Sequence, residues 1–380
     1  MPPDHTVQPA SPPLAVDAIL ANPGIRIVVC CGAGGVGKTT TAAALGLRAA
    51  EEHGRRTVVL TIDPARRLAQ SMGLTELDNT PRPVKGVAGE LHAMMLDMKR
   101  TFDEVVLAHT DPKRAEEIFA NPFYQAMSST FSGTQEYMAM EKLGQLRARD
   151  EWDLIVVDTP PSRSALDFLD APARLGRFLD GRMLRLVLAP ARAGGRSVFN
   201  LVSASFGLFS RAVTKILGTQ LLADLSGFVA ALDSMFGGFR ERAEQTYRVL
   251  QASETAFLVV AAPEPDAIRE AAYFAGRLAA ERMPLAGLVL NRVATMAAEG
   301  LSADAARAAA ARLAELGDQQ VTVDALRLHA ELVELTGRQE RVAARFRAEY
   351  PSVPVVEVAA QPADIHDVDG LRAIGTALVE

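Results

Sequence analysis

The stretch Cys31–Thr40 combines the residue types that bind a phosphate chain. Within it, Gly32, Gly37, Lys38 and Thr39 follow the spacing G-x-x-x-x-G-K-T. Glycines let successive backbone N–H groups turn toward one point, the lysine adds a positive charge, and the threonine hydroxyl can ligate Mg²⁺. The pattern predicts a triphosphate site formed by Gly34, Gly35, Val36, Gly37, Lys38, Thr39 and Thr40. The alternative is a glycine-rich turn with an incidental Lys-Thr pair.

Two aspartates follow apolar runs that read as buried strands. Asp63 ends the run 56–62 and Asp158 ends the run 154–157. Because ligands bind beyond the carboxyl ends of parallel strands, both carboxylates should face the bound phosphates. Asp63 suits a residue that orients or deprotonates the attacking water, although it can also simply cap a helix beginning at Pro64. Asp158 forms a Walker B pattern, in which the carboxylate holds the Mg²⁺ shell.

A third group of residues can contact a nucleobase. Asn291 ends the apolar strand 285–292, and its amide both donates and accepts hydrogen bonds, as an adenine edge requires. A turn-forming asparagine is an equal alternative. The last strand, 353–358, leads into a loop with Pro362 and Ala363, whose backbone can flank the base.

These residues need a strand before the glycine loop, a helix after it, and further parallel strands alongside. The apolar run 25–30 and the Ala-rich segment 38–52 provide the first two. The sequence therefore predicts an α/β protein with a doubly wound, mostly parallel sheet of the P-loop NTPase type and a helical insertion subdomain. We expect the core in two parts, 25–163 with a helical insertion over 99–149, and 251–380 with a helical hairpin over 301–348.

Two further segments are expected outside this core. The proline-rich residues 1–24 read as a mobile leader that ends in a short helix over Val16–Ala21. Residues 164–250 read as a helical subdomain, because large apolar residues recur at helical spacing between 197 and 239. These stripes either pack on each other as a core or line a groove for an apolar helix of a client protein, and the sequence does not choose.

Composition excludes several classes of function. A net charge of −6 disfavours a nucleic-acid-binding protein. The two cysteines are adjacent and no C-x-x-C motif is present, so we expect no zinc site and a reducing, cytoplasmic setting. The first 24 residues lack the positive charge of a signal peptide. The sequence contains no run of 18 apolar residues, so we expect no transmembrane segment. Peripheral contact with a membrane stays open.

Three ordered pieces, Gly34–Thr40, Thr61–Ala65 and Asp158–Ser162, resemble the signature-lysine branch of P-loop ATPases. More narrowly, they are similar to the family of the arsenite-pump ATPase and of the ATPase that targets tail-anchored membrane proteins. This resemblance implies that ATP and Mg²⁺ are bound through Lys38, Thr39 and Asp158, that Asp63 activates water, and that Asn291 and the Pro362 loop receive adenine. It also implies a dimer in which hydrolysis moves the helical subdomains.

The chain departs from the family pattern at two places. Ala33 stands where the signature lysine would cross to the partner's nucleotide, so a homodimer would lack that charge. Arg163-Ser164 replaces a usual Gly-His pair. A related subunit that keeps the lysine would restore the charge, and the chain is similar to actinobacterial members of the family that occur as paired, unlike subunits.

These features lead to three hypotheses. The first is a cytosolic Mg²⁺-dependent ATPase that couples its nucleotide state to dimer and helical-subdomain rearrangement, for handling a hydrophobic client. The second is a nucleotide-binding regulatory subunit of a heterodimer with a lysine-bearing paralogue. The third, a catalytic subunit of an arsenite efflux pump, is weakened because the chain has no three-cysteine site for a soft metalloid.

Overall fold

The computed structural model describes residues 11–63, 67–122, 124–125, 134–160, 241–296, 298, 300–317 and 319–380. The chain divides into two compact units. The first contains residues 1–95, 149–166 and 249–380, and the second contains residues 96–148 and 167–248. Most of the predicted helical subdomain, with its apolar stripes over 197–239, lies outside the described residues, as do Ser162 and the Arg163-Ser164 pair.

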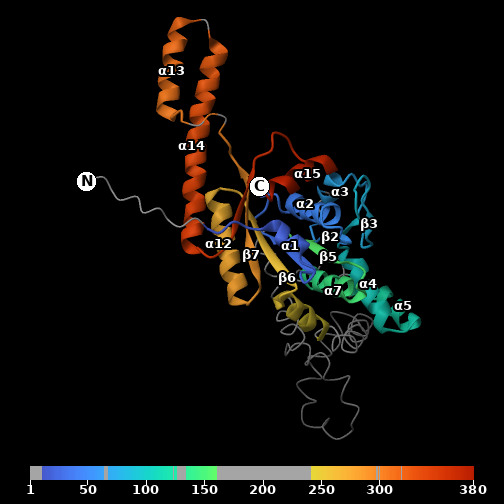
Figure 1. Ribbon diagram of the computed structural model, residues 1–380. Helices are drawn as coiled ribbons and strands as arrows, with labels where there is room; N and C mark the ends of the chain where they lie inside the picture. Colours follow the sequence, from blue (N-terminus) through green and yellow to red (C-terminus); the bar gives the residue numbers. More distant parts are fainter. Residues whose placement is uncertain are drawn as a thin grey trace, which may run out of the picture. The chain divides into compact units, whose positions relative to one another are not determined.

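Among the described residues, the first unit is built on one sheet of eight strands in the order β3-β4-β2-β5-β1-β6-β7-β8. Figure 1 labels β2, β3, β5, β6 and β7 of this sheet. All neighbouring strands are parallel except β3 and β4, so the prediction of a mostly parallel α/β sheet is confirmed. The strands are β1 Ile27–Cys31, β2 Thr57–Thr61, β3 Arg82–Pro83, β4 Leu91–Met95, β5 Leu154–Asp158, β6 Thr255–Ala261, β7 Leu285–Val293 and β8 Val355–Ala359.

Continuous apolar sequence explains the central strands. Every residue of β1, β2, β5 and β6 is buried, as expected for parallel strands that are covered on both faces. The edge strand β3 is only two residues long, is exposed, and contains Pro83, which cannot donate to a ladder. It escaped prediction because two residues are too few to show a period.

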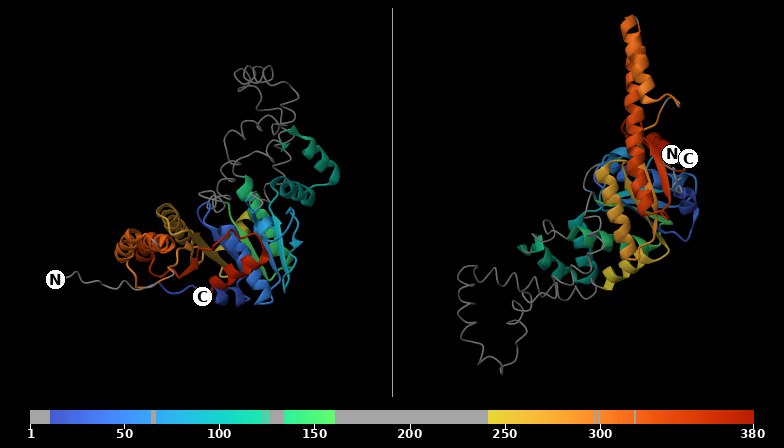
Figure 2. Two further views of the ribbon diagram at one scale, coloured as in Figure 1. Left: turned by 90° about the horizontal axis from the view of Figure 1, so that it is seen from above. Right: turned by 90° about the vertical axis from the view of Figure 1, so that its left-hand side faces the viewer.

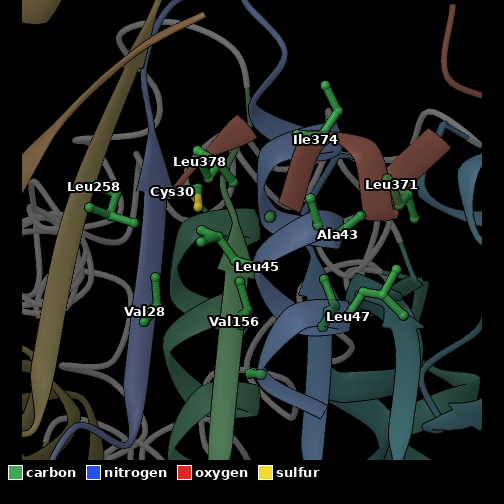
Figure 3. Close-up of a cluster of buried hydrophobic side chains, with 14 of the residues drawn as sticks. Val28, Cys30, Ala43, Leu45, Leu47, Val156, Leu258, Leu371, Ile374 and Leu378 are labelled. Atoms are coloured by element: carbon green, nitrogen blue, oxygen red, sulfur yellow. The ribbon is translucent and has the colours of Figure 1, made fainter. Parts of the chain in front are cut away.

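The helix after the glycine loop, α2 (Lys38–Glu51), packs on the sheet together with the C-terminal helix α15 (Val368–Ala377). Figure 3 shows Leu371, Ile374 and Leu378 at α15 directed into the same cluster as Ala43, Leu45 and Leu47 of α2. On the other side of β1 the chain runs through β6, α12 (Pro265–Ala280) and β7. The crossover from β1 to β2 through α2 and the crossover from β6 to β7 through α12 run in opposite directions along the sheet. Because both are expected to be right-handed, α2 and α12 lie on opposite faces and the sheet is doubly wound.

Two helices, α13 (Ala303–Leu316) and α14 (Gln320–Glu349), lie where the sequence predicts a hairpin. They run side by side away from the sheet, as two perpendicular views show (Figures 1 and 2). The C-terminal end of α14 is tied to α12, because the Tyr350 hydroxyl donates to the Ala272 carbonyl at 2.9 Å. In the second unit, helices α4 (Met98–His109), α5 (Pro112–Ala120) and α7 (Thr134–Arg149) are described.

Residues 12–14, predicted as part of a mobile leader over 1–24, are instead hydrogen-bonded to the start of β8. The N–H of Leu14 donates to the carbonyl of Val355 at 3.1 Å, and the N–H of Val355 donates to the carbonyl of Pro12 at 2.9 Å. The predicted short helix, α1 (Val16–Ala21), is present. The buried Arg55 guanidinium donates to the carbonyls of Leu20, Asn22 and Ile25, which fixes this segment to the sheet. Residues 1–10 are outside the described part.

Candidate functional site

The loop between β1 and α2 adopts a backbone that two of its glycines make possible. Gly32 has φ of +147°, and a Cβ there would lie 2.0 Å from the carbonyl oxygen of Val260. Gly37 has φ of +96°, and a Cβ there would lie 2.2 Å from Nδ2 of Asn291. Neither position has room for a side chain, so the loop conformation depends on glycine.

Helix α2 begins at Lys38, directly after this loop. Its N-cap, Gly37, has no side chain that could satisfy the first N–H groups, which leaves the positive end of a 14-residue helix at the loop. The Lys38 ammonium donates to the Ala33 carbonyl at 2.7 Å, and the residue is only 6% exposed. Burial lowers the pKa of Lys38, and the charges of Asp158 and Asp63 partly oppose that shift. The loop, helix end and ammonium together form a site for an anion.

Asp158 lies at the end of β5 and is fully buried. Its Oδ2 accepts hydrogen bonds from the hydroxyls of Thr39 at 2.8 Å and Thr61 at 2.9 Å. Its Oδ1 is buried and has no hydrogen-bond partner among the described residues. Burial raises the pKa of Asp158 to about 6, although the two hydroxyl donors and Lys38 act in the opposite direction. This carboxylate is therefore held in place with one oxygen unused.

The unused oxygen fits a hard cation. Mg²⁺ is commonly held by one or two carboxylates, hydroxyls and waters together with substrate phosphates, and it does not need an all-protein cage. Asp158 and Thr39 offer that donor set beside the anion site. Among the described residues no three His, Cys, Asp or Glu side chains cluster as a larger metal site would require.

Asp63 follows β2 by two residues and is half-buried. Its N–H donates to the Thr61 hydroxyl at 3.2 Å, and that hydroxyl donates to Asp158. Thr61 is also the register partner of Asp158 in the sheet, so the two carboxylate-bearing strand ends are joined by one side chain. Residues 64–66 are outside the described part, and α3 (Arg67–Ser71) follows them.

A cavity of about 860 Å³ adjoins these groups. The structure brings together along its wall Gly35, Gly37, Lys38, Thr39, Thr40, Asp63, Asn291, Pro362 and Ala363. Of the other predicted residues, Gly34 and Val36 belong to the loop without lining the cavity, and Asp158 lies beneath Thr39. These wall residues come from three segments that are far apart in the sequence.

Asn291 contacts the glycine loop as well as the cavity. Its Nδ2 donates to the Val36 carbonyl at 2.8 Å, and the side chain is buried. The ladder between β7 and β8 shifts register after Asn291, at Arg292, which has φ of +63°. This bulge turns the end of β7 toward the loop. The amide keeps one N–H and its oxygen for a ligand.

Several wall residues escaped prediction. Gln70 and Ser71 come from α3, Arg292 follows Asn291, and Ile365 and His366 extend the loop after β8. Arg67 also lies on the wall, and from the sequence the basic pair Arg66-Arg67 could serve either as phosphate contacts or as solvated side chains. The others carry no motif, and only the folded arrangement places them at the cavity.

The sheet order and this loop define the class of protein, a P-loop nucleoside triphosphatase fold. The family model described as "Anion-transporting ATPase" matches residues 25–306, about three quarters of the chain. The chain therefore belongs to the anion-transporting ATPase family, as the three motifs indicated. All of α14, β8 and α15 follow the matched region.

Similar proteins carry two kinds of name. The chain is 29% identical over 174 residues to "ATPase GET3" of Malassezia globosa, which covers 46% of this chain and 50% of that relative. It is 26% identical over 288 residues to "ATPase GET3B" of Arabidopsis thaliana, covering 69% and 62%. It is 30% identical over 155 residues to a "Putative arsenical pump-driving ATPase" of Prosthecochloris vibrioformis, covering 40% and 36%. The chain thus spans about half the length of the curated relatives it matches. No described helix combines the length and apolar character needed to cross a bilayer.

Proposed function

We propose that this chain binds ATP with Mg²⁺ and hydrolyses it. The observation that carries the proposal is the buried Asp158, whose Oδ2 is held by two threonine hydroxyls while Oδ1 remains available beside Lys38. Burying an ionised carboxylate costs free energy, and a cation bound to Asp158 would offset that cost. Membership of an ATPase family supports the same activity.

Each residue has a part in this proposal. The loop N–H groups, the start of α2 and Lys38 bind the β- and γ-phosphates. Thr39 and Asp158 hold Mg²⁺, which neutralises phosphate charge and polarises the γ-phosphoryl group. Asn291 and the loop with Pro362 and Ala363 face the base. The cavity wall includes Gly35, Gly37, Lys38, Thr39, Asn291, Pro362 and Ala363, and Asp158 is linked to it by the hydrogen bond from Thr39.

Asp63 acts on the attacking water in this mechanism. The water oxygen forms a bond to the γ-phosphorus while the bond to the β–γ bridging oxygen breaks, so that ADP leaves with that oxygen. The proton lost by the water passes to the Asp63 carboxylate and from there to solvent or to the phosphate released. The position of Asp63 on the cavity wall, close to Asp158 through Thr61, supports this role.

Mg²⁺-dependent phosphate release from ATP tests the function. The wild-type chain should release phosphate, Lys38→Ala should abolish release, and Asp63→Asn should lower turnover by about 10² to 10⁴ while nucleotide binding is kept. Thermal unfolding of each variant controls for misfolding. Absence of nucleotide binding by the wild type, or turnover unchanged in Lys38→Ala, would refute the proposal.

A second candidate is a nucleotide-binding subunit that adds little catalysis to a heterodimer. Ala33 favours it, because its methyl group stands where the family resemblance expects a lysine that reaches the partner's nucleotide. Mixing the chain with a related lysine-bearing subunit should then raise hydrolysis, and Asp63→Asn in this chain should leave that rate unchanged. If the same substitution lowers the rate, this chain contributes catalysis. We also propose that the chain works as a dimer, that hydrolysis rearranges its helical segments, and that this movement serves to handle a hydrophobic client.

A further inference from the structure

The short helix α3 presents two different faces. Leu68 is fully buried, and Ala69 and Met72 are 4% and 1% exposed, so these three side chains belong to the hydrophobic core of the first unit. Arg67 and Gln70, three positions apart and therefore on one side of the helix, line the cavity. The apolar face fixes the backbone, and the polar face is directed into the cavity.

The cavity wall contains few cations. Among its described residues, Lys38, Arg67 and Arg292 are positively charged at neutral pH. Lys38 lies beneath the glycine loop with its ammonium at the Ala33 carbonyl. Arg292 adjoins Asn291 at the end of β7, where the base is proposed to bind. Arg67 is four residues beyond Asp63, in the segment that carries the water-activating carboxylate.

Arg67 also differs from arginines that are paired with a carboxylate. Arg48 is paired with Asp17, Arg56 with Asp153, and Arg372 with Glu51. Arg67 is exposed and forms no ion pair with any described residue, although Asp63 lies on the same wall. The Arg67 guanidinium lies on an anchored helix, faces the anion site and is not neutralised by the described residues. It is therefore well placed to bind a phosphate, whose oxygens match the forked N–H groups of arginine.

We propose that Arg67 binds the γ-phosphate of ATP within the same chain and stabilises the negative charge that develops during its transfer. This inference rests on the proposed function and adds a residue to it. As the water oxygen bonds to the γ-phosphorus and the bridging oxygen departs with ADP, charge spreads over the γ oxygens and the leaving oxygen. Arg67 keeps its proton throughout and contributes only charge and hydrogen bonds. The chain would thereby have a second cation at its own site.

Binding of Mg²⁺-ADP and Mg²⁺-ATPγS to the full chain tests this without relying on turnover. Arg67→Ala should weaken ATPγS binding about tenfold and leave ADP binding within twofold, because only the former carries a γ-phosphate. Arg67→Lys should recover part of the loss. Arg312→Ala, an exposed arginine of α13 away from the cavity, is the matched control and should change neither affinity.

Turnover gives the second readout. Arg67→Ala should lower kcat about hundredfold, in line with the loss of one preorganised charge at the transferred group, with an unchanged midpoint of thermal unfolding. The inference is overturned if Arg67→Ala changes the two affinities equally or changes neither. It is distinct from the proposed function, because a wild-type chain that binds ATPγS through Arg67 but never hydrolyses ATP would refute hydrolysis and keep the role of Arg67 in binding.

Discussion

The two ends of the cavity are built in different ways. At the end proposed to bind phosphate, Lys38, Thr61 and Asp158 are all buried, and hydrogen bonds connect the ends of β2 and β5 with the start of α2. At the other end, Asn291 is buried, but Pro362 and Ala363 are exposed loop residues. Strand ends fix one end of the site, and a loop closes the other.

This difference has a physical consequence. Rigid, buried groups are preorganised, so substitutions there should change binding and catalysis by large factors. Exposed loop residues make contacts that solvent can replace, and substitutions there should change affinity modestly. Asn291 belongs to both ends, because its amide contacts the cavity and donates to Val36 in the glycine loop. We therefore expect the two ends to respond differently to substitution.

Gly37→Ala should have the largest effect. The new Cβ would lie 2.2 Å from Nδ2 of Asn291 and would force an L residue into φ of +96°. We expect ATP affinity to fall at least about hundredfold, because the loop must move and Asn291 must leave Val36. Titration calorimetry measures the affinity.

Gly317→Ala is the matched control for this substitution. Gly317 also has positive φ, +75°, but no atom lies within 4 Å of a Cβ there. It ends α13, so the substitution should cost about 1 kcal/mol of unfolding free energy and leave nucleotide affinity unchanged. Equal losses of affinity in the two variants would show that general destabilisation of the fold, and not a local change in the glycine loop, explains the effect at Gly37.

Asp158 should make Mg²⁺ binding depend on pH. Its pKa is raised from 3.8 to about 6 in the metal-free protein, and a metal ligand must be ionised. Affinity for Mg²⁺ in the presence of ADP should therefore fall about tenfold for each pH unit below about 6 and be flat above it. Titrations between pH 5 and pH 8 measure this, and a flat profile down to pH 5 would contradict the role of Asp158.

The same raised pKa predicts the direction of a stability change. The folded state binds the proton more tightly than the unfolded chain, so the metal-free protein should lose stability as pH rises from about 4 to about 6. At about 1.4 kcal/mol for each pH unit, the cost at pH 7 is about 3 kcal/mol. Asp158→Asn should remove this cost and raise stability in urea at pH 7, while eliminating the effect of Mg²⁺ on nucleotide affinity. If Asp158→Asn is less stable than the wild type at pH 7, the negative charge of Asp158 is already compensated in the folded protein, and the predicted cost does not exist.

The smallest effects should come from the loop end. Pro362→Ala should weaken ADP binding by no more than about threefold and leave inorganic tripolyphosphate binding unchanged, since we propose that the loop contacts the base. Asn291→Ala should weaken both ligands, by about tenfold, because it also removes the hydrogen bond to Val36. If Asn291→Ala affects ADP alone, its contact with the glycine loop does not support phosphate binding.

Sequence reasoning succeeded where local pattern and global position agree. The apolar runs of β1, β2 and β5 predicted parallel strands whose carboxyl ends lie at one edge of the sheet, and these strands are present. The buried state of Asp158, with its unused oxygen, was not predictable, since it depends on how Thr39 and Thr61 meet in space.

Three misses have separate physical causes. Residues 12–14 looked disordered from their prolines, yet a few backbone hydrogen bonds to β8 order them. Helix α15 was overlooked although Leu371, Ile374 and Leu378 have helical spacing, and its partner α2 lies more than 300 residues earlier. The position of Arg67 on the cavity wall could not be read from the basic pair Arg66-Arg67, because nothing in the local sequence reveals that Leu68 faces the core and Arg67 the cavity.

The central claim is that Lys38 and Asp158 together hold a magnesium–nucleotide complex. Calorimetric titration of ADP with and without Mg²⁺, in the wild type, Lys38→Ala and Asp158→Asn, tests it most directly. We predict that Mg²⁺ strengthens ADP binding at least about tenfold in the wild type, that Asp158→Asn retains only the metal-independent affinity, and that Lys38→Ala loses most of both. Equal ADP affinity with and without Mg²⁺ in the wild type, or normal binding by Lys38→Ala, would contradict the account.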